Sequence, residues 1–134
     1  MTAQDVIKAL SLTPIPEGGF YCEKSESAHS AMLSHGERKI YSSCYYLLDE
    51  NDVSCFHRLK SDEMWFYHLG ASFTMCIVEN GTLKTVVLGN DITNGEQPQI
   101  LLPAGTVFGA KPNDGWALCS CVVSPALDDA DIEL

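Results

Sequence analysis

The spacing of the hydrophobic residues changes near residue 13. Before that point Val6, Ile7 and Leu10 share one helical face, and Thr2 with Asp5 forms the pattern of a capping box. The sequence therefore predicts one short helix at the N-terminus. We expect it to end before the Thr-Pro-Ile-Pro segment, because a residue that precedes proline is restricted to extended conformations.

Beyond these prolines, apolar and polar residues follow one another in short runs rich in β-branched and aromatic side chains, as is typical of β-strands. Gly18 and Gly19 allow unusual backbone angles where the chain enters its first strand. Asn80-Gly81 predicts a type I′ hairpin, and the polar stretch 29–38 predicts a loop. Strands are expected at 40–48, 53–59, 63–69, 72–79, 82–88, 99–102 and 116–124. With no helix between them, they predict an all-β antiparallel sandwich or barrel.

Length and charge narrow the classes of function. A chain of 134 residues is expected to form a single domain, 1–134, that folds without a disulfide or a structural metal. It carries 8 Lys and Arg against 18 Asp and Glu, a net charge of −10. Such a surface repels phosphate backbones and anionic lipids, so neither nucleic acid nor a membrane is an expected partner.

The cysteines and the N-terminus indicate a reducing compartment. No basic start followed by an apolar run opens the chain, so no signal peptide is expected, and a cytoplasmic location with reduced thiols is the interpretation. Cysteines within apolar runs are interpreted mainly as core residues. They are Cys44, Cys55, Cys76, Cys119 and Cys121. Cys119-Ser-Cys121 is also compatible with a metal or redox pair, although no second Cys or His pair follows at zinc-site spacing.

The segment 55–70, CFHRLKSDEMWFYHLG, carries the most chemistry. Side chains alternate along a strand, and the face opposite His57 carries two cations, so His57 is expected to point into the barrel. If Glu63 also points inward, the two meet with Trp65 and Tyr67 along the wall. A carboxylate beside an imidazole forms a plausible acid/base pair, and it forms a structural hydrogen bond equally well, so both interpretations stay open.

The same segment resembles the first cupin motif, in which H-x-H is followed by Glu and then Gly. His57, Glu63 and Gly70 hold their positions at the right spacing, and Leu59 replaces the second histidine. The second motif, P-x-G-x-x-H, matches 103–108 with Phe108 in place of the histidine. Several longer segments resemble the cupin-5 branch, a family of uncharacterised cupins, over nearly the whole chain. They include PIPEGGFYCE, HRLKSDEMW, LGNDITNGEQPQILLPAG and VVSPALDDADIEL.

The resemblance implies an antiparallel jelly-roll (cupin) β-barrel that forms a homodimer. Because only His57 and Glu63 remain of the usual ligand positions, no metal or other cofactor is expected. The branch is similar in fold to the metal-free dTDP-sugar 3,5-epimerases, which use a histidine base, a supporting carboxylate and a tyrosine acid. This implies His57 as the base, Glu63 as its support and Tyr67 as the acid. The expected ligand-binding residues are Tyr45, Arg58, Trp65, Gln99 and Phe108.

Two classes of function therefore stay open. One is a small-molecule enzyme, epimerase-like and directed to a carbohydrate; the other is a non-catalytic ligand-binding or interaction protein. Ile15, Cys22 and Val107 replace the His, Arg and Trp usual in the branch, which removes polar or large groups near the pocket. A phenol across the cavity from His57 and a cationic rim would favour the enzyme. Aromatic side chains that fill the cavity would favour a plain core.

Overall fold

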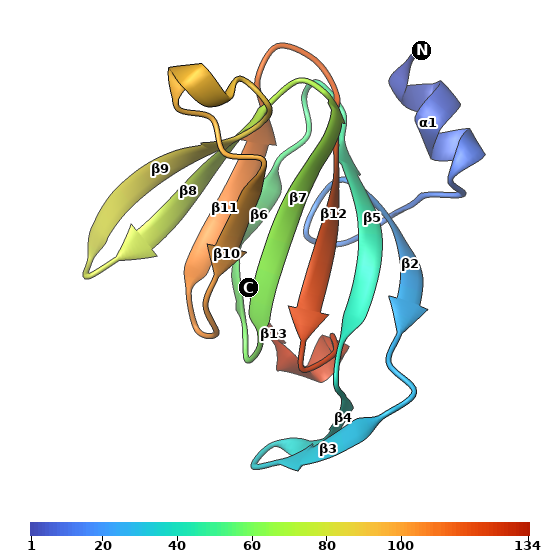
Figure 1. The fold of residues 1–134 in the computed structure, drawn as a ribbon, viewed down its shortest axis with the longest axis vertical. Helices are drawn as coiled ribbons and strands as arrows, with labels where there is room; N and C mark the ends of the chain where they lie inside the picture. The colour runs from blue at the N-terminus through green and yellow to red at the C-terminus, as the bar shows by residue number, and fades with distance from the viewer.

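Two antiparallel sheets face each other in the computed structural model, which describes residues 1–134 (Figure 1). One sheet consists, in spatial order, of β1 (Thr13–Pro14), β2 (Phe20–Glu26), β5 (Ser42–Leu48), β12 (Ala117–Ser124), β7 (Asp62–Gly70) and β10 (Gln99–Leu102). The other consists of β13 (Ile132–Glu133), β6 (Ser54–Leu59), β11 (Val107–Pro112), β8 (Phe73–Glu79) and β9 (Thr82–Leu88). The expected all-β jelly-roll architecture is confirmed.

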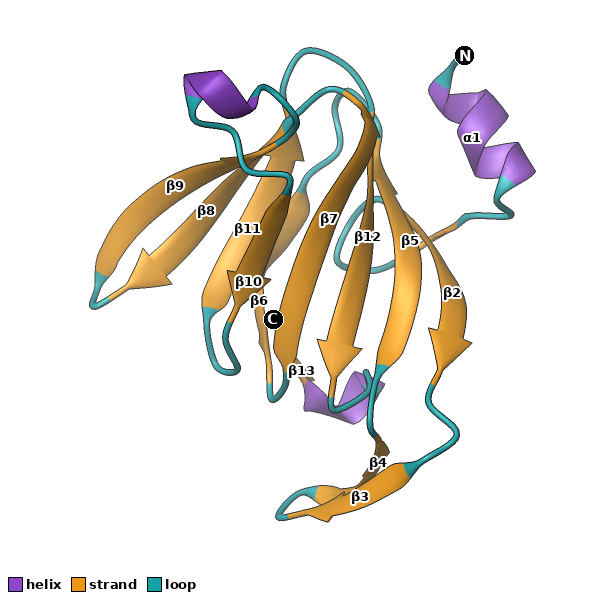
Figure 2. Cartoon of the chain, in the orientation of Figure 1, coloured by secondary structure: helices purple, strands orange, loops and turns teal.

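The expected N-terminal helix is also confirmed, as α1 (Ala3–Ala9) (Figure 2). Its capping box is complete, because the Asp5 N–H donates to the Thr2 hydroxyl and the Thr2 N–H donates to the Asp5 carboxylate. Val6 packs with Leu47 and Leu118 in a small apolar cluster outside the main core. The structure contains no helix long and apolar enough to cross a membrane.

All seven predicted strands appear within two residues of their expected bounds, and β9 and β10 match fully. The Asn80-Gly81 turn has φ of +52° and +75°, the two positive angles that a type I′ turn requires. The predicted loop at 29–38 is wrong, because β3 (Ser30–Leu33) and β4 (Gly36–Lys39) form a hairpin there. This hairpin stands apart from both sheets, so neither face needed the apolar alternation that would have revealed it.

The core lies between the sheets and is dominated by rings. The Trp65 indole meets three others edge-on, with centroid distances of 5.5 Å to Tyr46, 5.7 Å to Phe73 and 6.1 Å to Phe108. Edge-to-face contacts of this kind add to the stability gained from burying the rings. Trp65 is therefore fixed in place before any ligand enters the space beside it.

A glycine turn ties the chain before β2 to the start of β6. Gly18 has φ of +105°, and a Cβ there would come within 1.9 Å of the Val53 carbonyl oxygen. The adjoining Glu17 carbonyl accepts a hydrogen bond of 2.8 Å from the Cys55 N–H. The glycines are structural, as the sequence predicted, and they hold Glu17 beside the strand that carries His57.

Gly18→Ala should destabilise the protein by about 3 kcal/mol or more, because backbone strain and a clash with fixed backbone act together. Gly81→Ala is the matched control, since Gly81 also has positive φ but a Cβ there would meet no other atom within 4 Å. It should cost about 1–2 kcal/mol. Urea unfolding of both variants measures the difference, and equal losses would contradict a close contact at Gly18.

Candidate functional site

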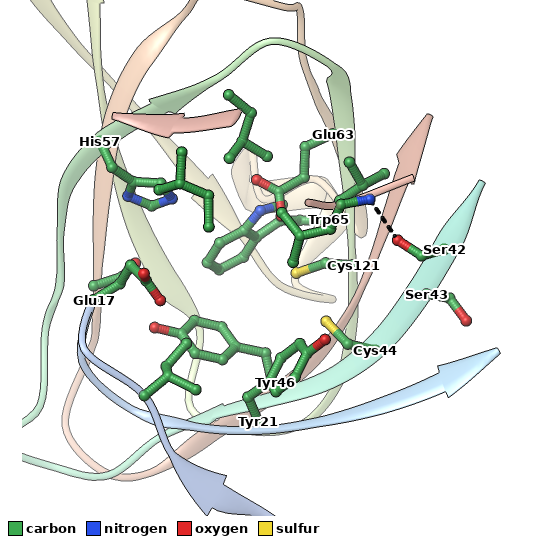
Figure 3. Close-up of a pocket in the computed structure, with 16 residues that line it drawn as sticks. Glu17, Tyr21, Ser42, Ser43, Cys44, Tyr46, His57, Glu63, Trp65 and Cys121 are labelled. Atoms are coloured by element: carbon green, nitrogen blue, oxygen red, sulfur yellow. Dashed lines mark hydrogen bonds between the residues drawn. The ribbon is translucent and has the colours of Figure 1, made fainter. Parts of the chain in front are cut away.

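A cavity of about 70 Å³ lies between the sheets, and it is lined by 16 residues (Figure 3). They come from β2, β5, β6, β7 and β12, from the turn before β2, and from the C-terminal segment. Since a single water needs roughly 10–15 Å³, the cavity has room for a few waters or a small ligand. A nucleotide sugar is too large for it.

An irregular step in β6 brings His57 into this cavity. Ala110 of β11 pairs with Ser54 while Phe108 pairs with His57, so β6 has one extra residue in a β-bulge. Ser54 and His57 are therefore both buried and line the cavity, whereas Cys55 is exposed. The interpretation of Cys55 as an inward core residue is wrong, because the bulge breaks the strict alternation on which it rested.

The hydrogen bonding of His57 leaves a free lone pair. Its Nδ1 lies 2.6 Å from the Cys55 carbonyl oxygen, which can only accept, so Nδ1 carries a hydrogen and donates it. In the neutral ring the lone pair is then on Nε2, which has no hydrogen-bond partner in the protein. The Phe108 ring lies behind His57 with a centroid distance of 4.6 Å and limits its rotation. His57 is thus oriented to accept a proton at Nε2.

Glu63 enters the same cavity from β7 and is nearly fully buried, with 9% of its surface exposed. Its Oε1 has no hydrogen-bond partner. Burial raises the pKa of this carboxyl from its ordinary 4.5 to about 7, although the nearby Trp65 indole and Cys121 thiol oppose part of that rise. Near neutral pH both the protonated and the ionised forms of Glu63 are therefore populated.

A second orphaned polar atom lies next to this carboxyl. The Trp65 Nε1–H is buried without an acceptor, and Figure 3 shows the indole nitrogen and the Glu63 carboxyl together at one side of the cavity. Leaving a buried polar group unpaired costs about 1–3 kcal/mol. A hydroxyl group can accept from the indole and donate to the carboxylate, so it would satisfy both atoms.

Two phenols that were not predicted from the sequence face this cavity. Tyr46, from β5, donates its hydroxyl hydrogen to the Gly18 carbonyl. Tyr21, from β2, has its pKa raised by burial, so its hydroxyl stays protonated and able to donate. Alternation through Cys44, Tyr46 and Leu48, all of which pack into the core, would have pointed to Tyr46 rather than Tyr45.

The two tyrosines predicted from the sequence lie elsewhere. The Tyr67 hydroxyl donates to the Gly70 carbonyl at 2.6 Å, and Tyr67 is not among the residues that line the cavity. Tyr45 lies on the outer face of its sheet, where it packs near α1 and meets the His68 ring at 6.3 Å. Neither phenol is placed to exchange a proton with a ligand beside His57.

Three more of the expected ligand-binding residues also lie outside the cavity wall. Arg58 is exposed and donates to Glu133 at 2.7 Å. Gln99 is exposed on β10, and its amide contacts the Met64 sulfur at 3.8 Å. Phe108 is buried behind His57. Of the eight residues selected from the sequence, His57, Glu63 and Trp65 line the cavity together.

The wall of the cavity carries no positive side chain. Its ionisable groups other than His57, the tyrosines and the thiols are Glu17 and Glu63. Of the two features that would favour a sugar-nucleotide epimerase, phenols line the cavity with His57, and the cations Arg58 and Lys60 line an adjoining surface hollow and not the cavity itself. A diphosphate has no counter-charge here, which favours an uncharged ligand.

The side chains do not fit a metal ion. His57 and Glu63 are the only donors at the usual cupin positions, and Leu59, which lines the cavity, and Phe108 occupy the others. No three His, Cys, Asp or Glu side chains are grouped so that they could hold one. Protein-held transition metals normally need three or four such ligands.

Two thiols form part of the cavity wall. Cys44 and Cys121 are directly opposite each other on β5 and β12, and burial raises the pKa of Cys121 well above its ordinary value. Both therefore remain protonated thiols rather than nucleophiles. All six cysteines are free, and the interpretation of Cys119 and Cys121 as core residues is confirmed.

Comparison with known proteins places these features in a family. The sequence profile named Cupin_5 and described as "Cupin superfamily (DUF985)" matches residues 4–134. A hypothetical protein from Leishmania major is 33% identical with a TM-score of 0.94, over 100% of this chain and 87% of that one. A structure from Shewanella oneidensis is 43% identical with a TM-score of 0.93, over 100% of this chain and 84% of that one.

More distant likeness shows the fold alone. Oxalate decarboxylase from Bacillus subtilis is 16% identical with a TM-score of 0.66, over 90% of this chain and 29% of that one. No curated protein matches the chain.

Glu63→Gln should make the protein more stable at alkaline pH. The carboxyl pKa is raised in the folded state, so its contribution to stability is full below pH 4.5 and is lost as pH rises through about 7. The loss is on the order of 3 kcal/mol, and glutamine avoids it. Urea unfolding at pH 5 and pH 8 should show a larger gain at pH 8.

The exposed Glu50→Gln variant controls for the loss of one negative charge. An equal gain from both variants, or a Glu63→Gln gain that is the same at both pH values, would show that burial does not raise the Glu63 pKa.

Proposed function

Because this chain belongs to the Cupin_5 family of the cupin superfamily, we propose that its cavity binds a small, uncharged molecule with hydroxyl and carbonyl groups, of the carbohydrate class. The observation that carries the proposal is the pair of unpartnered atoms, Glu63 Oε1 and Trp65 Nε1, both buried at the cavity. Apolar walls with a few convergent polar groups are typical of small-molecule sites. The size and charge of the lining favour a compact ligand over a sugar nucleotide.

The His57–Glu63 pair supports a proton-transfer reaction of the isomerase or epimerase type without a metal. His57 Nε2 takes a proton from the carbon next to the ligand's carbonyl, and the electron pair of that C–H bond forms a carbon–carbon double bond. Protonated Glu63 gives its proton to the carbonyl oxygen, which produces an enediol. The imidazolium then gives its proton to the neighbouring carbon while the Glu63 carboxylate takes the proton of the other enediol hydroxyl, which yields the isomer and restores both side chains.

A second candidate is a ligand-binding protein without catalysis. The positions of Tyr67 and Tyr46 favour it, since the first lies outside the cavity and the second already donates to Gly18. Proton exchange from a bound ligand separates the two candidates, because a binding protein holds the ligand and leaves its C–H bonds intact.

The enzyme proposal predicts exchange of carbon-bound hydrogen in D₂O. Dihydroxyacetone and glyceraldehyde are suitable probes, because they are small and uncharged and carry a hydrogen next to a carbonyl group. The protein should accelerate loss of that hydrogen's NMR signal, and the rate should fall as pH rises above about 7, where Glu63 ionises. His57→Gln should remove the acceleration, and buffer alone gives the background. Binding of either probe without exchange would favour the second candidate.

Trp65→Phe should weaken binding of the same probes by about 10-fold, because one neutral hydrogen bond is worth about 0.5–1.5 kcal/mol. Trp116→Phe is the matched control, since Trp116 packs beside α1 and not in the cavity. Ligand-observed NMR titration gives the affinities. Equal affinity of Trp65→Phe and wild type for the probes would show that the Trp65 N–H does not bind the ligand.

A further inference from the structure

The C-terminal segment 127–134 forms part of the cavity wall. Its Leu127 and Ile132 line the cavity together with side chains of five strands and of the turn before β2, among them the residues labelled in Figure 3. Ile132 and Leu59 also line a neighbouring surface hollow that contains Arg58 and Lys60. Leu127 and Ile132 line a second hollow on the side of Thr13 and Pro16. Ile132 thus lies between the cavity and both hollows, with Leu59 beside it on one side and with Leu127, Ile15, Glu17 and Tyr21 on the other.

One charged contact holds most of the segment in place. Arg38 of β4 donates twice to Asp131, from Nε to Oδ2 at 2.8 Å and from Nη2 to Oδ1 at 3.0 Å. Asp131 is buried, with 5% of its side chain exposed. A bidentate, charge-assisted pair of this kind is stronger than a neutral hydrogen bond. The other charged contacts of the segment are longer or more exposed. Arg38 Nε lies 3.8 Å from Asp128 Oδ2, His35 Nε2 lies 3.7 Å from Asp131 Oδ2, and the Arg58–Glu133 pair is exposed on both sides.

The remaining attachments are short. Strand β13 has only two residues, which pair with Leu59 and Arg58 of β6, and the Leu127 N–H donates to the Ser42 hydroxyl at 2.9 Å. Strands β5 and β12, by contrast, pair through seven residues on each side. Releasing the segment would leave β7, which carries Glu63, between β12 and β10, and would leave β6, which carries His57, paired with β11 alone.

We propose that residues 127–134 form a lid that opens and closes over the cavity, with the Arg38–Asp131 pair as its clasp. In the closed state Leu127 and Ile132 shield His57 and Glu63 from water. Opening moves these two side chains away, joins the cavity to the adjoining hollows and gives a ligand access. The hairpin β3–β4 would then hold the lid closed, because it carries Arg38, which donates to Asp131.

Two cysteines report on the lid. Cys44 lies in the cavity wall, whereas Cys119 is fully buried in the core and does not line the cavity. Methyl methanethiosulfonate converts a cysteine thiolate to a methyl disulfide and releases methanesulfinate. The Cys44 thiol is protonated in the cavity wall, so it should react only when the lid opens and water reaches it. Peptide mass spectrometry gives the labelling rate of each cysteine, and the exposed Cys55 serves as the internal standard.

Asp131→Asn should raise the labelling rate of Cys44 by roughly 10-fold, because the charge-assisted bonds to Arg38 are weakened. Asp129→Asn is the matched control on the same turn, since Asp129 is exposed and makes no ion pair, and its Cys44 rate should equal wild type. Cys119 and Cys55 should keep their rates in both. The lid proposal would be wrong if the Cys44 labelling rate in Asp131→Asn were unchanged. It would also be wrong if the labelling rates of Cys44 and Cys119 rose equally, because that would indicate general unfolding.

Hydrogen exchange tests the lid in the unaltered protein. Amides of Asp131 and Ile132 should exchange at least 10-fold faster than those of Cys44 and Cys121, because the lid opens while β5 and β12 stay paired. Equal protection of both sets would show that the segment does not open separately. Neither measurement involves a ligand, so a failure of the lid leaves the binding and proton-transfer proposals standing.

Discussion

The candidate site depends on a carboxyl group that is nearly fully buried and whose Oε1 has no hydrogen-bond partner. Glu63 lies between the sheets beside an indole N–H that is equally unpartnered, and burial raises the carboxyl pKa to about 7. A side chain that served only to stabilise the fold would be expected to have its hydrogen bonds satisfied. The free energy lost by leaving these two atoms unpaired is what the proposed hydroxyl-bearing ligand would recover on binding.

The fold places the other groups around this carboxyl. The rings about Trp65 fix the indole, the bulge in β6 turns both Ser54 and His57 inward, and the Cys55 carbonyl selects the tautomer of His57. The Gly18 turn holds Tyr46 at the opposite wall. An imidazole with a free Nε2, a buried carboxyl and several apolar side chains thus share one small volume, and no Lys or Arg side chain lines it.

The strand periodicity and the Asn80-Gly81 turn predicted much of the fold, and the family resemblance predicted the jelly roll. Strand β11 was missed because Gly109 and Pro112 interrupt its pattern, and Gly109 is needed where a Cβ would lie 3.0 Å from the Ser54 carbonyl oxygen. Alternation put Trp65 and Tyr67 on the same face as Glu63, and of these Trp65 and Glu63 line the cavity with His57 whereas Tyr67 does not. Arg58 was selected by nearness in sequence, whereas the opposite wall comes from strands β2 and β5, which only the tertiary fold brings close. The homodimer implied by the resemblance stays a prediction.

The most direct test of this account is a titration of the Glu63 carboxyl. Carbon-13 NMR of protein labelled at glutamate side chains, assigned with Glu63→Gln, follows the carboxyl shift against pH. The account predicts a midpoint at about 7. A midpoint at the ordinary value of 4.5 would contradict it. Such a midpoint would mean that water already solvates the carboxyl, so that a ligand hydroxyl would gain no free energy by pairing with it.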